Sequence, residues 1–307
     1  MKAKDFLSIA DVSSDEIEAL LDKADEIKAH PERYRTTLTG QTLAMIFQKP
    51  SLRTRVSFEV GIQQLGGHGI YLGPTDIQLH RGETIADTAR VLSRYCNGIM
   101  ARVFGHKDVE DLGRYATVPV INGLSDLTRP CQAMADYMTL REKRGRNVAG
   151  LKLAYVGDGN NVAHSLILAG AKLGVNVALA CPEGYQPKRE ILERAAPDAK
   201  RRACRVEVFT RPEDAVKGAD VIYTDVFTSM GQEKEKQERQ KAFTGYMVTG
   251  ALMKLAKPEC VFMHCLPAHR GEEVAAEVAD SPQSVIFDEA ENRLHAQKAI
   301  MAELMAR

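Results

Sequence analysis

The stretch KLAYVGDGNNVAHSLILAGAKLGVNVALACP, residues 152–182, decides the fold. It contains a short apolar run, KLAYVGD, then the segment HSLILAGAKL with the composition of a buried helix, and then a second apolar run, NVALACP. Two buried strands joined by a helix are typical of a parallel sheet. The sequence therefore predicts a parallel sheet that helices cover on both faces.

The same alternation continues on both sides of this stretch. Near the start, Ser13 or Ser14 precedes Asp15 and Glu16, which is the pattern of a capped helix, and this helix is expected to reach about His30. Strands are then expected at 42–47, 69–72, 98–104 and 118–122, with helices at 56–65, 84–95, 108–116 and 131–144. Downstream, strands are expected at 205–209, 221–226 and 260–267, with helices at 187–196 and 212–219 and a last helix from about 292 to 306.

A polar segment without periodicity, RGRNVAG at 144–150, separates the two series and is the predicted junction. The length of 307 residues accommodates two hydrophobic cores. We therefore predict an α/β fold with two doubly wound parallel-sheet domains of similar size linked by helices.

The composition excludes several classes of protein. Apolar residues make up 44% of the chain and charged residues 27%, which is ordinary for a globular protein with a packed core. Lys and Arg number 41, as do Asp and Glu, so no net field attracts nucleic acid or an anionic membrane. The start lacks the apolar run of a signal peptide, and no stretch reaches the roughly 18 apolar residues of a membrane span. We expect a cytoplasmic protein with neither a membrane nor a nucleic-acid partner.

The six cysteines show no CxxC spacing, so we predict reduced and mostly buried thiols at Cys96, Cys131, Cys181, Cys204, Cys260 and Cys265. The segment CVFMHCLPAHRGEE, residues 260–273, places His264, Cys265 and His269 just past an expected strand. A zinc site is not expected there, because no second pair of ligands has metal spacing. A Cys-His nucleophile stays open on composition.

The stretch KPSLRTRVSFE, residues 49–59, carries cations directly ahead of an expected helix. Cations at a helix N-terminus oppose the helix dipole, so an anion is expected to compensate for them. Ser51 and Thr54 add hydroxyl donors, and Arg53 and Arg55 offer guanidinium forks that match phosphate oxygens. The glycines and the GK[ST] of a P-loop are absent. The stretch therefore predicts an anion site of another kind.

Other polar clusters follow expected strands, where α/β proteins place their sites. Arg102 lies inside an apolar strand and needs either an ion-pair partner or a ligand, and both remain open. A helix beginning at Pro130, after NGLSDLT, again favours an anion. DVFTSMGQ, residues 225–232, offers an acid and a hydroxyl suited to an amine. YVGDGNN lacks the third glycine of a dinucleotide fingerprint, since position 162 is Val162, which argues against a nicotinamide cofactor.

In this order, the motifs resemble the aspartate/ornithine carbamoyltransferase family over essentially the whole chain. SLRTRVSFE, residues 51–59, is similar to the family's carbamoyl-phosphate loop, with Leu52 in place of a usual Thr. DVFTSMGQEKE (225–235) and MHCLPAHRGEEV (263–274) are similar to two signatures of the ornithine branch. The resemblance implies transfer of the carbamoyl group from carbamoyl phosphate to the δ-amine of L-ornithine, giving L-citrulline and phosphate in arginine metabolism. It implies no metal or organic cofactor, and a homotrimer with shared active sites.

The resemblance also assigns residues to the two substrates. For carbamoyl phosphate it implies contacts from Ser51, Leu52, Arg53, Thr54, Gln78, Arg102, Arg129, Gln132, Cys265, Leu266 and Arg293. Leu52 would contribute its backbone N–H, and Gln78 would reach the site of an adjacent subunit. For ornithine it implies Asn161, Asp225, Ser229 and Met230. Catalysis would rest on Arg102, Arg129, Asp225 and Cys265, with the last two as alternative acceptors of the amine proton.

By the same resemblance, residues 1–145 form a carbamoyl-phosphate-binding domain on which a C-terminal helix, about 292–307, packs back. Residues 146–291 form an ornithine-binding domain. A second position, besides Leu52, departs from the family pattern, because Arg129 stands where the family usually has His before the Pro-Cys-Gln triplet. A guanidinium donates the same kind of hydrogen bond but cannot act as an acid near neutral pH. Two alternatives therefore stay open: a transferase for putrescine or an N-acylated ornithine, and a catalytically impaired binding homologue.

Overall fold

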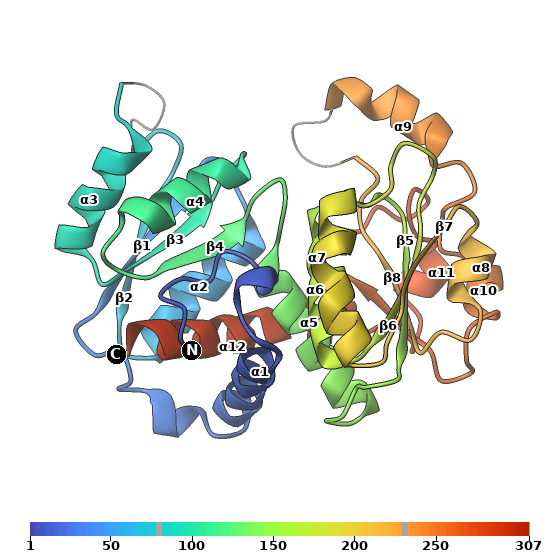
Figure 1. The fold of residues 1–307 in the computed structure, drawn as a ribbon, viewed down its shortest axis with the longest axis horizontal. Coiled ribbons are helices and arrows are strands. Elements are labelled where there is room, and N and C mark those ends of the chain that lie inside the picture. The colour runs from blue at the N-terminus through green and yellow to red at the C-terminus, as the bar shows by residue number, and fades with distance from the viewer. Residues whose placement is uncertain (78–81, 229–232, 307) are drawn as a thin grey trace. The chain divides into compact units, whose positions relative to one another are not determined.

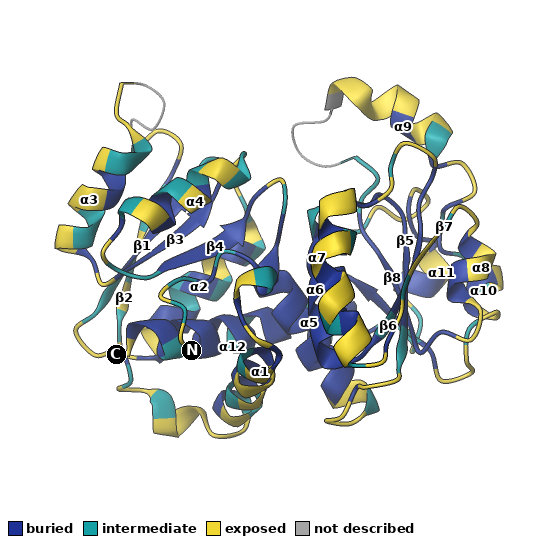
Figure 2. Cartoon of the chain, in the orientation of Figure 1, coloured by how far each residue is buried: buried dark blue, intermediate teal, exposed yellow. Residues whose placement is uncertain are grey.

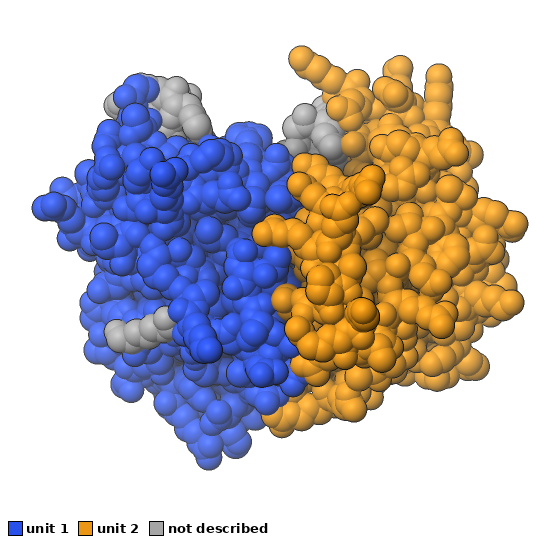
Figure 3. Space-filling view, in the orientation of Figure 1, with its two compact units in different colours: residues 1–138, 291–307 blue, residues 139–290 orange. Residues whose placement is uncertain are grey.

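A computed structural model describes residues 1–77, 82–228 and 233–306. The chain forms two compact units, which Figure 3 shows in separate colours. Unit 1 comprises residues 1–138 and 291–307, and unit 2 comprises residues 139–290. Both unit boundaries fall inside helices, the first within α5 (Pro130–Arg144) and the second within α12 (Ile286–Met305). The prediction that helices link two α/β domains is thus confirmed.

Unit 1 is built around a parallel sheet with strand order β2-β1-β3-β4 (Figure 1). Its strands are β1 (Thr42–Phe47), β2 (His68–Leu72), β3 (Gly98–Arg102) and β4 (Val120–Leu124). Its helices, besides α5 and α12, are α1 (Ser14–Ala29), α2 (Leu52–Gln64), α3 (Ile85–Tyr95) and α4 (His106–Tyr115). Two short 3₁₀ helices, Ile9–Asp11 and Pro31–Tyr34, flank α1.

Burial on both faces explains why β1 and β3, the two central strands of unit 1, are largely apolar. One face of β1 packs Ala44 and Ile46 against Ala89 of α3 and Leu112 of α4. Helices α2 and α12 cover the other face, where Gly98 of β3 lies against Met305. The central strands are dark blue throughout in Figure 2. This double burial is the condition that favours a parallel sheet.

Unit 2 repeats the architecture with a parallel sheet of order β7-β6-β5-β8-β9. Its strands are β5 (Lys152–Val156), β6 (Asn176–Ala180), β7 (Val206–Phe209), β8 (Val221–Thr224) and β9 (Val261–His264). Its helices are α6 (Asn161–Leu173), α7 (Arg189–Arg201), α8 (Pro212–Val216), α9 (Lys236–Ala242), α10 (Gly250–Met253) and α11 (Ala276–Ala279), with a 3₁₀ turn at Glu233–Glu235. The βαβ prediction for residues 152–182 is confirmed, since β5 pairs with β6 in parallel register across α6.

The helices near the end of the chain differ from the sequence prediction in the following respects. Helix α12 begins at Ile286 rather than near residue 292, because the N–H of Val285 bonds to the carbonyl of Phe262 and the chain turns helical directly afterwards. The expected elements include no helix between residues 226 and 260, where the charged run Lys236–Ala242 forms α9. All six cysteines are free and buried, as predicted.

Across the described parts of the chain, no helix is both long enough and apolar enough to span a membrane.

Candidate active site

The start of α2 in unit 1 is organised by two hydroxyl groups. Ser51 is the N-cap, and its Oγ accepts the backbone N–H of Thr54 at 3.3 Å. Oγ1 of Thr54 lies 3.1 Å from the Ser51 hydroxyl and accepts a hydrogen bond from Nη2 of Arg293 at 2.9 Å. Arg293 is only 1% exposed although it carries a full charge. A buried guanidinium is therefore fixed beside a helix N-terminus, and both features favour an anion.

The three cations of the stretch 49–59 take different places. Arg55 is held on the helix surface, 3.2 Å from Glu59 and with its guanidinium 3.9 Å from the ring centre of Tyr71. Lys49 stacks on Phe104 at 4.7 Å, and burial together with the charge of Arg102 lowers the pKa of its ammonium. Arg53 is half-buried in the first turn of α2. Of the three, Arg53 is the one whose place in the first turn suits direct contact with an anion.

Two further guanidinium groups are buried in unit 1. Arg102 ends β3 and is 8% exposed, so its side chain is largely kept from water. Arg129 is also 8% exposed, and its carbonyl accepts the N–H groups of Gln132 and Ala133 at the start of α5. Burial raises the pKa of the Cys131 thiol to about 12. The charges of Arg293 and Arg129 lower this pKa, but their effect is smaller than that of burial. Cys131 is therefore a protonated structural thiol with two cations near it.

Gln132 lies one turn inside α5, 1% exposed, and its amide Nε2 donates to Asp136 at 2.8 Å. Asp136 thereby orients the amide. The structure thus brings to unit 1 the predicted residues Ser51, Arg53, Thr54, Arg102, Arg129, Gln132 and Arg293. Leu52 is the first residue of α2 with its side chain 74% exposed, so only its backbone N–H is suited to the predicted role.

In unit 2, Asp225 is the centre of a second cluster. It directly follows β8, and its Oδ2 accepts a hydrogen bond from the amide of Asn160 at 2.9 Å. Its Oδ1 accepts from the backbone N–H of Val226 at 2.8 Å and from the thiol of Cys265 at 3.2 Å. In this arrangement Cys265 is a donor. The sequence alternative of a Cys-His nucleophile is less suited to this geometry than a thiol that helps to hold the carboxylate.

His264 is buried completely and braces the segment that carries Cys265 and Leu266. Its Nδ1 accepts the backbone N–H of Leu266 at 2.8 Å, which leaves Nε2 as the donor towards Glu273 at 3.2 Å. Its own backbone N–H donates to Glu289 at 2.8 Å. Leu266 has φ of 59°, a backbone conformation that costs a non-glycine residue energy and persists only when neighbours hold it. His264 thus fixes the backbone next to Cys265.

A third contact set holds α9. The guanidinium of Arg239 donates to Asp158 at 2.7 Å and to the carbonyl of Phe227 at 3.0 Å, and it also pairs with Glu235. Burial raises the pKa of Asp158 above its ordinary value, and Arg239 opposes that shift. Sequence reasoning missed this pair, because 81 positions separate the two residues.

Two other outcomes concern the ornithine set. The resemblance assigns Asn161 to ornithine; in the structure Asn161 opens α6 half-buried, and its neighbour Asn160 donates to Asp225. Asn160 also caps α6 through the N–H groups of Val162 and Ala163, and an N-cap position was the available signal for it. Gln78, Ser229 and Met230 lie outside the described residues.

Among the residues that the structure describes, two groups have ligand atoms close enough to hold a metal, within 4.8 Å of one another. The buried group is Asp225, His264 and Cys265, and the other is His269, Glu272 and Glu273. In the buried group both Nδ1 of His264 and the thiol of Cys265 are already in hydrogen bonds. A metal there would have to displace these bonds.

Comparisons with known proteins cover both units. A family model described as "Aspartate/ornithine carbamoyltransferase, carbamoyl-P binding domain" matches residues 4–142, and one described as "Aspartate/ornithine carbamoyltransferase, Asp/Orn binding domain" matches residues 149–304. An ornithine carbamoyltransferase of Thermococcus kodakarensis is 60% identical, across 99% of this chain and 97% of its own. A relative in Pyrococcus furiosus, described as an anabolic ornithine carbamoyltransferase, is 58% identical across 99% and 97%. A solved structure of ornithine carbamoyltransferase from P. furiosus superposes with a TM-score of 0.95 at 58% identity, covering 98% of this chain and 96% of that one.

Proposed function

The chain belongs to the aspartate/ornithine carbamoyltransferase family, and we propose that it transfers the carbamoyl group of carbamoyl phosphate to the δ-amine of L-ornithine. The products are L-citrulline and phosphate. The observation that carries the proposal is the N-terminus of α2, where the buried Arg293 donates to Thr54 beside the capping Ser51. The proposed direction is synthetic, towards citrulline, because the P. furiosus relative is described as anabolic.

Carbamoyl phosphate is assigned to unit 1. Helix N-termini bind phosphate through backbone N–H groups, and Leu52 and Arg53 supply these at the start of α2. Arg53 and Arg293 add charge, and the hydroxyl groups of Ser51 and Thr54 add donors. Arg102, Arg129 and Gln132 complete the set for the carbamoyl group. The proposed carbamoyl-phosphate domain is residues 1–145 with the helix at about 292–307.

Ornithine is assigned to unit 2, within the proposed domain 146–291. The carboxylate of Asp225 is the acceptor for the δ-ammonium, because a carboxylate stabilises a nearby cation. Asn160 and Cys265 keep its two oxygens in place. Asn161 remains the proposed contact for the amino-acid end, and Leu266 is proposed to line the site near the attacking amine. Ser229 and Met230 keep their proposed roles, although they lie outside the described residues.

In the proposed reaction, negative charge develops on the substrate groups that face the cations of unit 1. When the amine attacks, the carbamoyl oxygen gains charge and phosphate departs, so fixed guanidinium groups stabilise the transition state more than the ground state. The amine must be neutral to attack, and Asp225 is the proposed acceptor of its proton, directly or through Cys265. Holding the amine against the carbamoyl carbon adds the orientation term, for which effective molarities of about 10⁵ to 10⁸ M are known.

The assembly and the location complete the proposal. We propose a homotrimer in which Gln78 reaches the site of an adjacent subunit, as the family resemblance implies. The six free, buried cysteines suit a reducing compartment, which supports the cytoplasm. Size-exclusion chromatography with light scattering checks the trimer, and a mass of one or two chains would contradict it.

The test of function is citrulline formation from carbamoyl phosphate with three amines compared at equal concentration. L-Ornithine is expected to give a kcat/KM at least about a hundredfold above those of putrescine and N-acetyl-L-ornithine, because a site built for a polar group discriminates strongly against its absence. A higher kcat/KM for putrescine or N-acetyl-L-ornithine would mean that this amine, rather than L-ornithine, is the substrate. If carbamoyl phosphate neither supported turnover nor raised the melting temperature, the impaired homologue would be the better description.

A further inference from the structure

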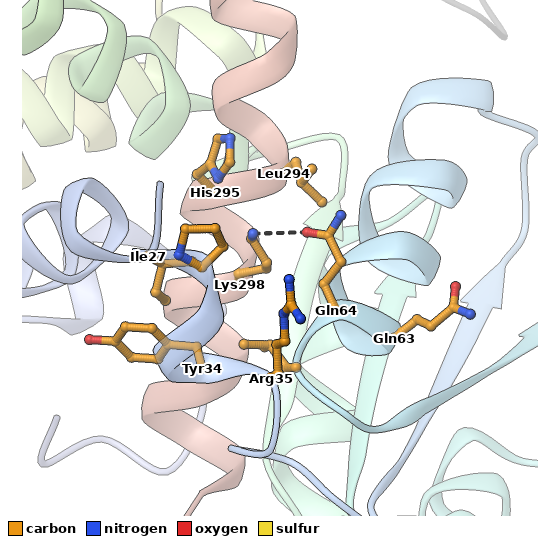
Figure 4. Close-up of a pocket in the computed structure, with 10 residues that line it drawn as sticks. Ile27, Tyr34, Arg35, Gln63, Gln64, Leu294, His295 and Lys298 are labelled. Carbon is orange, nitrogen blue, oxygen red and sulfur yellow. Dashed lines mark hydrogen bonds between the residues drawn. The ribbon is translucent and has the colours of Figure 1, made fainter. Parts of the chain in front are cut away.

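Unit 1 contains a cavity of about 500 Å³ that has no part in the proposed reaction. Figure 4 shows the side chains that line it. They come from the end of α1 and the following turn, from the end of α2 and from α12: Ile27, Pro31, Tyr34, Arg35, Gln63, Gln64, Leu65, Leu294, His295 and Lys298. Volumes of this size are typical of sites for small organic molecules.

The main reason to assign a ligand here is the ammonium group of Lys298. The side chain is 2% exposed, and its Nζ donates one hydrogen bond, to Oε1 of Gln64 at 2.9 Å, which Figure 4 marks. Within residues 1–77, 82–228 and 233–306, no carboxylate lies within 4.0 Å of it. Burying an ammonium without a counter-charge is costly, so proteins normally pair it or place it beside a bound anion.

A second cation faces the same cavity. The side chain of Arg35 points towards the Lys298–Gln64 pair in Figure 4. It too has no carboxylate within 4.0 Å among the residues that the structure describes. The nearby acids contact other groups, since Glu26 lies 3.7 Å from Arg33, and Glu291 lies 3.4 Å from both Lys28 and His295. The cavity is therefore lined by two cations and by no acid.

His295 supplies a third polar feature. Its Nε2 lies 3.4 Å from Glu291, and its Nδ1 is buried with no hydrogen-bond partner in the described structure. Burial, and then the charges of Lys298 and Lys28, lower the pKa of this imidazole to about 4, so the ring is neutral near pH 7. The other walls are the aromatic ring of Tyr34 and the apolar side chains of Leu65 and Leu294.

We propose that this cavity binds a small organic anion, a carboxylate or a phosphate ester with an apolar or aromatic body. Lys298 and Arg35 hold the anionic group, Nε2 of Gln64 adds a donor, and Tyr34, Leu65 and Leu294 contact the body of the ligand. The site is separate from the start of α2, because Gln63 and Gln64 lie at the opposite end of that helix.

The test titrates phenyl phosphate and benzoate into the full-length protein by isothermal calorimetry. All titrations use an Arg53→Ala background, so that an anion bound at the start of α2 does not obscure the cavity. At least one probe is expected to bind once per chain. Lys298→Met in that background is expected to weaken binding about tenfold or more, because a charge-assisted hydrogen bond is lost. Lys107→Met is the matched control, since this lysine pairs with Asp111 on α4, away from the cavity lining.

Several results separate the possibilities. Lys298→Arg retains the charge and is expected to restore binding, and Lys298→Met is expected to be at least as stable as its parent, because it removes a buried charge. Tighter binding of benzoate would identify the ligand as a carboxylate, and tighter binding of phenyl phosphate would identify it as a phosphate ester. A crystal soaked with 4-bromobenzoate is expected to show the bromine anomalous signal inside the cavity. Absence of binding by both probes, equal affinity in the Lys298→Met protein, or a cavity filled by a second copy of the chain would overturn the proposal.

Discussion

Arg129 stands where the family resemblance implies a histidine, and its burial makes this difference informative. The side chain is 8% exposed beside the start of α5, close enough to Cys131 to affect its thiol. A histidine there would change its charge near pH 6.5, whereas a guanidinium keeps its charge at all working pH values. The acid limb of the pH profile therefore distinguishes the two side chains.

The first prediction concerns Arg129→His. The wild-type kcat for citrulline formation is expected to lie within about a hundredfold of the kcat of the variant, because the guanidinium of Arg129 is also able to donate a hydrogen bond to the carbamoyl oxygen in the proposed site. The variant is expected to gain a pH dependence near 6.5 that the wild type lacks. Measuring kcat from pH 5.5 to 9 checks both points. A gain of several orders of magnitude in the variant would show that the natural protein is nearly inactive.

The second prediction separates two neighbouring cations. Arg53→Ala is expected to raise the KM for carbamoyl phosphate and to lower kcat by about a hundredfold or more, because it removes a direct contact to the leaving phosphate. Lys49→Ala is expected to change both constants less than about tenfold, since Lys49 stacks on Phe104. Steady-state kinetics at saturating ornithine provide the comparison. Similar losses from both substitutions would mean that the phosphate contact has been assigned to the wrong residue.

Residue types indicate the kind of site, but they do not indicate which of several similar residues takes which place. The charge conflict at 49–59 indicated an anion site, but only the structure separates Arg55, held by Glu59 and Tyr71, from Arg53. Asn160 and Asn161 are chemically identical, so helix geometry rather than composition decides which of them reaches Asp225.

At the scale of elements, α1 shows how a local signal fixes a helix start. The N-cap Ser13 accepts the N–H of Glu16, and the Glu16 carboxylate accepts the N–H of Ser13 at 2.8 Å, which completes a capping box. Hydrogen bonds from the backbone N–H groups of Ser13 and then of Lys2 lower the pKa of Glu16 to about 2. The ordinary value is 4.5.

The third prediction follows from the sign of that shift. Because the folded-state pKa of Glu16 is depressed, its stabilisation is fully present above about pH 4.5 and is lost as the pH falls towards 2. Glu16→Gln keeps a capping side chain but removes the charge, and is expected to lower the free energy of unfolding by about 0.5 kcal/mol at pH 6. Urea unfolding between pH 6 and pH 3 is expected to show this difference shrinking. The control is Glu83→Gln, which lies just before α3 and outside the capping box of α1. An unchanged difference at pH 3, or an equal pH trend in the control, would contradict the role of the Glu16 carboxylate.

Element existence was predictable because the strands are continuous apolar runs, and β1 occupies the predicted residues 42–47. Element ends were less predictable, since α12 begins where the backbone of Val285 pairs with Phe262, a contact between distant segments. The position of α9 likewise depends on the Arg239–Asp158 pair.

At the scale of the molecule, the sequence predicted two parallel sheets but not their strand order. Apolar runs separated by helices indicate that neighbouring strands are parallel. Which strand lies at the centre of each sheet, β1 in one and β5 in the other, depends on how the crossover helices pack. The last residues of the chain return to unit 1, where Arg293 bonds to Thr54 and Lys298 bonds to Gln64.

The fourth prediction concerns a chain truncated after residue 290. Loss of 291–307 removes Arg293 and the packing of Met301 and Met305 against Gly61 and Gly98, so unit 1 is expected to lose most of its protection from hydrogen exchange. The strands of unit 2 are expected to keep theirs, because their core lies within residues 139–290. Peptide-resolved hydrogen exchange on both proteins gives the result, and unchanged protection of β1 and β3 would contradict it.

The division of unit 1 into two separate segments also affects the order of folding during synthesis. Unit 2 is an insertion between residues 138 and 291, so every residue of it has been translated before the segment that completes unit 1. Domains usually become structured from the N-terminus onwards as the chain leaves the ribosome. In this chain, residues 1–138 are translated well before residues 291–307, which complete unit 1. Unit 2, encoded between them, is therefore the first unit whose whole sequence has been translated.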